Sequence, residues 1–264
     1  MRRLLPLLLL ALCAVSGVMA AESAAVGKRL PPGIVGQDDR TPLDSTAWPW
    51  HSLGRLSINR EKGEYCSGAL IAPDAVLTAG HCLYNRILKN WQSPEAIIFV
   101  AGLNRDTYQA SSHGKAIVHD PDFHVQGEPN LTQIAHDWAV LRLQEPLPLK
   151  PLPVRRLPAS DPKAAHAASA KSEAPHLLRA GYSMDRPFLL SLHDGCNLLG
   201  RLENDAILFT NCDSTYGDSG SPLLMQEGGQ FWIVGVGSAI LKRGRNPGAY
   251  AVHSAVFINQ LHLR

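Results

Sequence analysis

The chain has 264 residues, of which 45% are hydrophobic and 18% charged, and its formal net charge is only +2 at pH 7. This length accommodates one large domain or two small ones, each with its own hydrophobic core. The nearly balanced charge gives no reason to expect nucleic acid or an acidic partner. The 22 Gly and 19 Pro are spread along the chain, which favours many short elements joined by turns over long helices.

The N-terminal residues predict export. Arg2 and Arg3 precede an apolar stretch over residues 4–18, and small residues end at Ala20. This pattern predicts a secretory signal peptide over residues 1–20, cleaved after Ala20. A transmembrane anchor is the alternative, but the stretch of about 15 residues is shorter than the roughly 20 that a bilayer requires. We therefore expect a secreted or periplasmic protein with no membrane association after the signal peptide is removed.

Cysteines are the next feature, because export implies an oxidising compartment. Cys13 leaves with the signal peptide, so an even number remains: Cys66, Cys82, Cys196 and Cys212. Three pairings exist, and the spacing favours Cys66–Cys82 and Cys196–Cys212. Each bond would add about 3 kcal/mol by restricting the unfolded chain. A zinc site is the alternative, which the lack of a close Cys-x-x-Cys pair weakens.

The rest of the chain predicts short strands. Residues 21–33 are small, polar and Pro-rich, and are predicted to be a propeptide or spacer. Apolar, β-rich runs then cover residues 68–71, 75–78, 96–100, 138–143, 206–210, 221–225 and 231–236. Such runs, separated by turn residues, favour an all-β sandwich or barrel. The Pro-, Ala- and Lys-rich stretch 146–176 marks a connection between two halves, and residues 254–263 predict a short terminal helix.

Three local motifs carry residue types that catalysis uses. The first, Thr78-Ala79-Gly80-His81-Cys82, places a histidine at the end of an apolar strand beside a predicted disulfide. That bond would fix the backbone of a general base, which must stay within hydrogen-bond reach, about 2.6–3.2 Å, of the proton it moves. The second motif is Asp137 before the apolar run 138–143. A carboxylate there would hold the imidazole in one tautomer, although an acid at a strand start is more often a turn residue.

The third motif is Gly217-Asp218-Ser219-Gly220-Ser221-Pro222. Glycines on both sides of Ser219 allow a tight turn, and the N–H groups of Gly217 and Ser219 would form an oxyanion hole. Alone, such a Gly/Ser/Asp cluster is usually only a turn.

Together, the three motifs resemble the chymotrypsin-like serine peptidase family, in which the chain order is also His, Asp, Ser. The resemblance covers roughly residues 34–264. An α/β-hydrolase is the alternative, but its elbow requires Gly two residues after the serine, where this chain has Ser221, and its order ends in His. The pairing Cys66–Cys82 around the histidine loop is also a family feature.

The resemblance implies an all-β fold of two six-stranded antiparallel Greek-key barrels with a short C-terminal helix. The first barrel is expected over about 34–147, the connection over about 148–176, and the second barrel over about 177–264. The site would lie in the cleft between the barrels. The implied activity is hydrolysis of polypeptides by a monomer, without cofactor or metal. A catalytically inactive binding protein of the same fold is the alternative from another functional class.

The implied roles follow from the motifs. Ser219 is the nucleophile, His81 the general base and Asp137 its orienting acid. The sequence Ser-Gly-Ser-Pro from Ser219 onward, and residues 36–40, resemble the bacterial branch that includes staphylococcal glutamyl endopeptidase. Asp218 departs from that branch, which often has an amide residue there.

Asp218 therefore predicts an activation switch of the trypsin type. Cleavage after Gly33 would free Ile34, whose ammonium would pair with Asp218 and form the oxyanion hole. The alternative is that Ile34 and Val35 only pack near the terminus, since activators of that type cleave after Arg or Lys.

Substrate preference is predicted from the same resemblance. Asp213 stands six residues before the nucleophile, at the pocket floor, and would attract Arg or Lys. Gly248 matches the pocket wall, Ser238 the strand that binds the substrate backbone, and Ile240 a bulky departure at the pocket entrance.

Glu specificity is the alternative to a preference for Arg or Lys, with His253 as its supporting residue. Residues 119–124, rich in His and Asp, are predicted to be a surface loop rather than a metal site.

Overall fold

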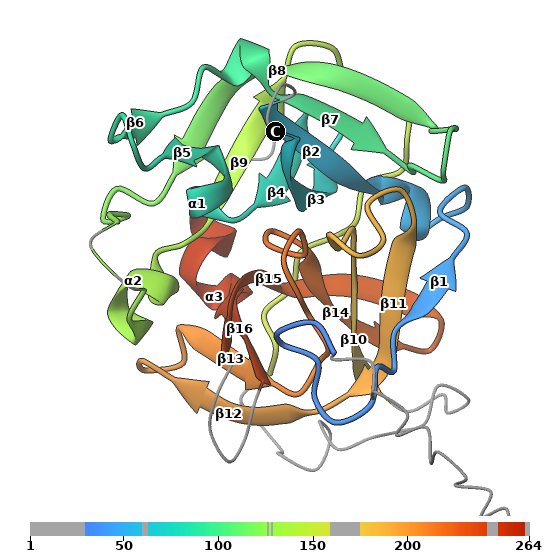
Figure 1. The fold of residues 1–264 in the computed structure, drawn as a ribbon, viewed down its shortest axis with the longest axis vertical. Helices are drawn as coiled ribbons and strands as arrows, with labels where there is room; N and C mark the ends of the chain where they lie inside the picture. The colour runs from blue at the N-terminus through green and yellow to red at the C-terminus, as the bar shows by residue number, and fades with distance from the viewer. Residues whose placement is uncertain are drawn as a thin grey trace, which may run out of the picture.

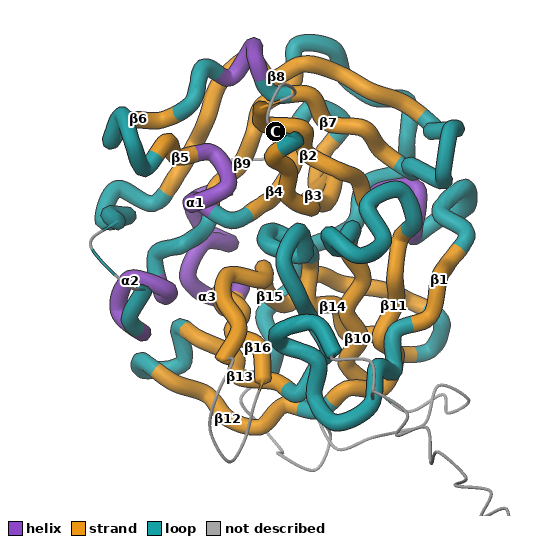
Figure 2. The backbone as a smooth tube through the Cα atoms, in the orientation of Figure 1, coloured by secondary structure: helices purple, strands orange, loops and turns teal. Residues whose placement is uncertain are grey.

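Strands dominate the computed structural model, which describes residues 30–59, 63–125, 127, 129–158, 175–241 and 248–261. The predicted signal peptide lies outside these residues, as does most of the predicted spacer. The strands form a closed barrel and a larger sheet, one lobe above the other in Figures 1 and 2, with short helices at the boundary between them. The predicted all-β class is confirmed.

The first lobe is a closed antiparallel barrel of six strands in the order β2-β3-β4-β9-β8-β7. Its strands are β2 (Leu53–Asn59), β3 (Glu64–Ala72), β4 (Ala75–Thr78), β7 (Ile98–Ala101), β8 (Ala110–His119) and β9 (Ala139–Leu143). Leu56, Leu70, Phe99 and Leu141 fill its interior and are fully buried. Burial of such side chains contributes about 1.5–3 kcal/mol each, which fixes the barrel on which the histidine motif stands.

The second lobe is an eight-stranded sheet in the order β1-β11-β10-β14-β15-β16-β13-β12. Its strands are β1 (Thr41–Leu43), β10 (His176–Gly181), β11 (Leu190–Cys196), β12 (Leu198–Leu202), β13 (Ile207–Thr210), β14 (Pro222–Glu227), β15 (Gln230–Leu241) and β16 (Gly248–His253). Only Asn197 separates β11 from β12, although the two lie toward opposite ends of the sheet, so the sheet curls back on itself. If β11 and β12 are counted as one bent strand, the predicted six strands are present, and β1 is an addition.

The strand β1 corrects the predicted domain boundary. Residues 41–43 were expected in the first barrel, but β1 pairs antiparallel with β11, with Thr41 opposite Leu192. Figure 1 shows β1 in blue beside β11 in orange, two segments far apart in sequence. The N-terminal segment therefore crosses to the second lobe before the first barrel begins.

Short helices complete the fold: α1 (Gly80–Leu83), α2 (Leu131–Ala135) and α3 (Ser254–Phe257), with 3₁₀ turns at Trp50–Ser52, Pro94–Ala96 and Ile258–Gln260. A two-stranded ribbon, β5 (Tyr84–Asn85) and β6 (Asn90–Trp91), follows α1. The terminal helix agrees with the sequence prediction, and its Phe257 packs against Trp138 with ring centroids 5.6 Å apart. Among the described helices, none has the length and apolarity needed to cross a bilayer.

The predicted disulfides are both present, joining Cys66 to Cys82 and Cys196 to Cys212. The described part of the connection, residues 148–158, packs on the protein, with Leu152 fully buried and its N–H bonded to the Leu70 carbonyl. The rest of the predicted connection, residues 159–174, lies outside the described residues.

Candidate active site

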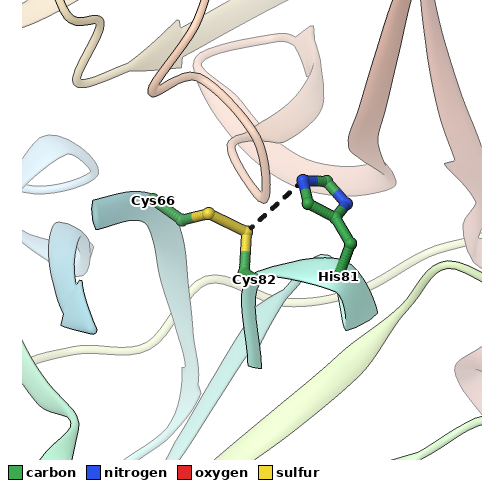
Figure 3. Close-up of side chains that lie close together, drawn as sticks. All are labelled: Cys66, His81 and Cys82. Carbon is green, nitrogen blue, oxygen red and sulfur yellow. Dashed lines mark hydrogen bonds between the residues drawn. A yellow bond between two sulfur atoms is a disulfide. The ribbon is translucent and has the colours of Figure 1, made fainter. Parts of the chain in front are cut away.

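The histidine is held by its own short helix and by the first disulfide. His81 lies in α1, directly after β4, and its neighbour Cys82 is bonded to Cys66 on β3. Figure 3 shows the disulfide beside the imidazole, whose Nε2 lies 3.9 Å from the Cys82 sulfur. The disulfide links α1 covalently to β3 of the barrel, which restricts movement of the backbone that carries the imidazole.

Asp137 binds His81 through both of its carboxylate oxygens. Its Oδ1 accepts the His81 backbone N–H at 2.7 Å, and its Oδ2 lies 2.7 Å from His81 Nδ1. The Ser238 hydroxyl, from β15 of the other lobe, also donates to Oδ2. Because a carboxylate only accepts hydrogen bonds, the Nδ1 proton points to Asp137 and Nε2 is left as the acceptor.

The surroundings of Asp137 keep its carboxyl group ionised. Burial opposes the charged form, but the charge and hydrogen bonds of His81, together with the Ser238 hydroxyl, outweigh it and hold the pKa of Asp137 below its ordinary value. The carboxylate is therefore ionised at neutral pH and stabilises an imidazolium when one forms.

Ser219 sits in a turn that only glycines permit on either side. Gly217 and Gly220 have φ of +90° and +78°, and a Cβ on Gly220 would lie 2.1 Å from Thr78 Oγ1. From the first barrel, Ser67 fixes the turn: its N–H donates to the Ser219 carbonyl at 2.8 Å and its hydroxyl to the Gly217 carbonyl at 3.0 Å. The turn is thus clamped between both lobes.

The predicted oxyanion donors remain available. Among hydrogen bonds within the described part of the chain, none uses the backbone N–H of Gly217 or Ser219. Ser219 is half-buried and lines, with His81, an open cleft of about 1060 Å³. Two unpaired amides beside a serine in such a cleft are the groups that would stabilise a tetrahedral oxyanion.

The walls of this cleft come mainly from the second lobe. They include the predicted Ser238 and Ile240, and also Tyr250 of β16. Gly248 does not lie among the described lining residues. A Cβ there would lie 2.5 Å from the Thr210 carbonyl oxygen and 2.6 Å from the Phe209 ring. Its smallness therefore serves packing within the sheet.

Asp213 departs from its predicted place. Its Oδ1 accepts the Val35 N–H and its Oδ2 the Asp39 N–H, both at 2.8 Å, and its side chain is 0% exposed. The carboxylate anchors the N-terminal segment and is absent from the described residues that line the cleft. Both carboxylate oxygens of Asp213 thus accept hydrogen bonds from backbone N–H groups that are 178 and 174 residues away in sequence. Asp213 therefore holds the N-terminal segment in the structure and does not form the predicted pocket floor.

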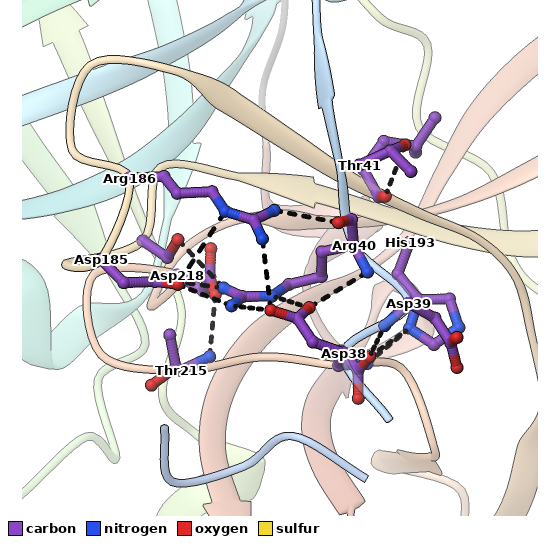
Figure 4. A network of polar contacts seen from close by, with 12 residues as sticks. Asp38, Asp39, Arg40, Thr41, Asp185, Arg186, His193, Thr215 and Asp218 are labelled. Carbon is purple, nitrogen blue, oxygen red and sulfur yellow. Dashed lines mark hydrogen bonds and ion pairs between the residues drawn. The ribbon is translucent and has the colours of Figure 1, made fainter. Parts of the chain in front are cut away.

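The N-terminal segment is further held by an arginine network, drawn in Figure 4. Arg40 pairs with Asp38 at 2.9 Å and with Asp185 at 2.8 Å, and Arg186 donates to the Arg40 carbonyl at 2.9 Å. The sequence reading missed this network, because Asp185 and Arg186 are distant in sequence and lie in an ordinary turn pattern.

Asp218 and Ile34 are not partners in the chain described, which runs unbroken through residues 30–34. The Ile34 N–H donates to the Pro31 carbonyl at 3.4 Å, whereas Asp218 Oδ2 accepts the Thr215 N–H at 2.8 Å. Arg179 supplies positive charge near Asp218. The switch that would follow cleavage after Gly33 stays a prediction.

Asp218 leads to a prediction about stability. Burial raises its pKa from an ordinary 3.8 to about 6, against the attraction of Arg179. Between these pH values the unfolded chain binds fewer protons than the folded one, so this group makes stability fall as the pH rises from about 4 to 6. The replacement Asp218→Asn should remove that fall, about 3 kcal/mol at 1.36 kcal/mol per pKa unit.

Urea unfolding at pH 4 and pH 7 measures this difference for the variant and the wild type. An exposed acid serves as control, and Asp106→Asn should reproduce the wild-type change. Equal pH dependence in Asp218→Asn and wild type would contradict the assignment.

Metal ligation was not expected, and that expectation stays a prediction. Asp120, Asp122 and His136 approach closely enough to hold an ion. However, Asp120 already accepts the Trp138 indole N–H at 2.8 Å, which gives it a structural role behind β9. His253, named for the Glu alternative, bonds the Leu157 N–H instead and does not line the cleft among described residues.

The trypsin family model matches residues 34–260, and the chain belongs to that family. A solved structure titled as a Glu endopeptidase in complex with MPD shares the fold, with a TM-score of 0.66 and 22% identity, over 86% of this chain and 97% of that one.

Two curated proteins are similar over shorter regions. The extracellular metalloprotease of Bacillus subtilis (strain 168) is 29% identical over 117 residues, which are 43% of this chain and 35% of that protein. Coagulation factor XII of Bos taurus is 38% identical over 81 residues, 31% of this chain and 12% of that protein. The chain thus spans about a third or less of the length of these relatives.

Proposed function

We propose that the protein is a secreted serine endopeptidase that cleaves through an acyl-enzyme. The observation that carries the proposal is that His81 contacts Asp137 through two of its atoms, each at 2.7 Å, and lines one cleft with Ser219. Family membership supports it independently.

The proposed reaction uses the groups in sequence. His81 Nε2 removes the hydroxyl proton of Ser219 as its oxygen attacks the scissile carbonyl carbon. The N–H groups of Gly217 and Ser219 stabilise the oxyanion, and Asp137 stabilises the imidazolium. The imidazolium then protonates the leaving amine, and the acyl ester remains on Ser219. Water, deprotonated by His81, hydrolyses that ester and restores the hydroxyl.

Export is part of the proposal. It is supported by the sequence of residues 1–20 and by two disulfides, bonds that persist in oxidising compartments. The inactive binding protein is the weaker alternative, because all three catalytic residue types are retained around one cleft. Activation through Ile34 remains a hypothesis, and active enzyme that begins at Ala21 would disprove it.

The preference for Arg or Lys is not carried forward. That preference required a free Asp213 carboxylate at the pocket floor. In the structure, both oxygens of this carboxylate accept the N–H groups of Val35 and Asp39.

An activated ester tests the proposal. Mixed with a p-nitrophenyl ester, the protein should release a rapid burst of nitrophenol close to one equivalent per molecule, followed by slower turnover, since acylation precedes deacylation. The variant Ser111→Ala, at an exposed serine on β8, should give the same burst. Linear release without a burst, together with no cleavage of quenched peptides, would contradict the proposal.

A further inference from the structure

Arg179 is a charged residue at the inner wall of the catalytic cleft. It lies in β10 between Leu178 and Ala180, is only 5% exposed, and lines the same cleft as Ser219. Because the residue is otherwise buried, its remaining accessible surface faces that cleft. An arginine in such a position is ionised at neutral pH.

The guanidinium is placed by its neighbours. Its Nε donates to the Ser221 hydroxyl at 2.9 Å, and its Nη2 to the Asp218 carbonyl at 3.2 Å. Space for it exists only because position 237 is glycine: a Cβ on Gly237 would lie 1.9 Å from Nη2. Gly237 directly precedes Ser238, which lines the cleft, so the guanidinium lies under the wall that a substrate side chain would meet.

The same guanidinium keeps unused binding capacity. Its Nη1 donates to no hydrogen bond found within the described part of the chain. Among ion pairs between described residues, none includes Arg179, although Asp218 acts on it at longer range. The charge of Asp218 compensates that of Arg179 only without direct contact, so a ligand carboxylate that binds the free Nη1 would add a charge-assisted hydrogen bond.

The surroundings favour an anion in this space. Of the described residues that line the cleft, none is Asp or Glu, and the guanidinium groups are those of Arg179 and Arg86. Hydroxyls of Ser214 and Thr215 lie on the same walls. Asp213 precedes Ser214 in sequence, but both of its carboxylate oxygens accept hydrogen bonds from backbone N–H groups and it does not line the cleft among described residues.

We propose that Arg179 is the specificity-determining residue of this cleft and binds the side-chain carboxylate of an acidic residue immediately before the scissile bond. This inference rests on the proposed endopeptidase function. It favours the acidic substrate class that was the alternative in the sequence analysis, and it assigns the recognition to Arg179 instead of His253. Arg179 also touches both sides of the nucleophile turn, so the test must separate substrate recognition from positioning of Ser219.

The test uses matched quenched peptides that differ only in the residue before the cut: Glu, Asp, Gln, Arg or Phe. For the wild type, kcat/KM for the better acidic peptide should exceed that for Gln by about 100-fold or more, because the uncharged amide leaves the guanidinium unpaired. The variant Arg179→Met should reduce the acid-to-Gln ratio to about fivefold or less. Loss of turn positioning would slow all peptides alike and leave the ratio unchanged.

Two further variants complete the test. Lys115→Gln removes an exposed cation on β8, which is not among the described residues that line the cleft, and should keep the acid-to-Gln ratio within about twofold of wild type, which excludes a general effect of charge. Arg179→Lys keeps the charge and should keep part of the ratio. A wild-type preference for Arg or Phe, or an unchanged ratio in Arg179→Met, overturns this inference while the ester burst remains. Absence of both burst and cleavage would instead overturn the proposed function.

Discussion

The replacement Ser219→Ala should lower kcat for the best quenched peptide by about 10⁶-fold. The change removes the attacking oxygen, and the remaining groups then only bind substrate and stabilise charge. Within the described part of the chain, Ser67 and Arg179 make side-chain hydrogen bonds to the turn and the Ser219 hydroxyl makes none, so the fold should be retained. Steady-state turnover and thermal unfolding, measured on the same preparation, check both statements.

A matched serine variant makes this result specific. Ser111→Ala should keep kcat within about twofold, since surface substitutions away from special features change little. Residual activity of Ser219→Ala above one-hundredth of wild type would mean that another group is the nucleophile.

The second large effect is expected for Asp137→Asn, with kcat lowered by about 10⁴-fold. An amide at this position can donate to His81 Nδ1, which moves the imidazole proton to Nε2, where the base must accept. The loss should appear in kcat, with little change in KM, because Asp137 contacts His81 and Ser238 and would act through the imidazole. Peptide kinetics over a range of concentrations separate the two constants.

Ser238→Ala is the graded comparison for this variant. It removes one of the hydrogen bonds to the Asp137 carboxylate but leaves the charge, so a decrease of about tenfold is expected. If Asp137→Asn were as active as Ser238→Ala, the carboxylate would not be the group that orients His81.

The sequence predicted those parts of the fold that local patterns encode. The apolar runs at residues 75–78 and 138–143 became β4 and β9, because strands buried in a barrel require such runs. The strand β8 was missed, since much of its surface is exposed and its residues 110–119 are largely small or polar. The pairing of β1 with β11 depends on residues about 150 positions apart, which no local pattern records.

The residues of the site also differ in whether a local sequence pattern predicts them. The triad of His81, Asp137 and Ser219 could be proposed from the sequence because each member stands in its own short motif. Asp213 was misplaced, since the amides that bind it lie far away at Val35 and Asp39. Arg179 was missed because it is a single charge in the apolar run 177–180. Only the folded chain shows that Gly237 makes room for it and that its guanidinium reaches the catalytic cleft.

The most direct measurement is to map the residue that a fluorophosphonate modifies. Such reagents phosphonylate an activated serine hydroxyl and displace fluoride, and digestion with mass spectrometry locates the adduct. We expect one equivalent on the peptide that contains Ser219, none in Ser219→Ala, and strongly slowed labelling in Asp137→Asn. An adduct on a different serine, or equal labelling of wild type and Ser219→Ala, would contradict this expectation.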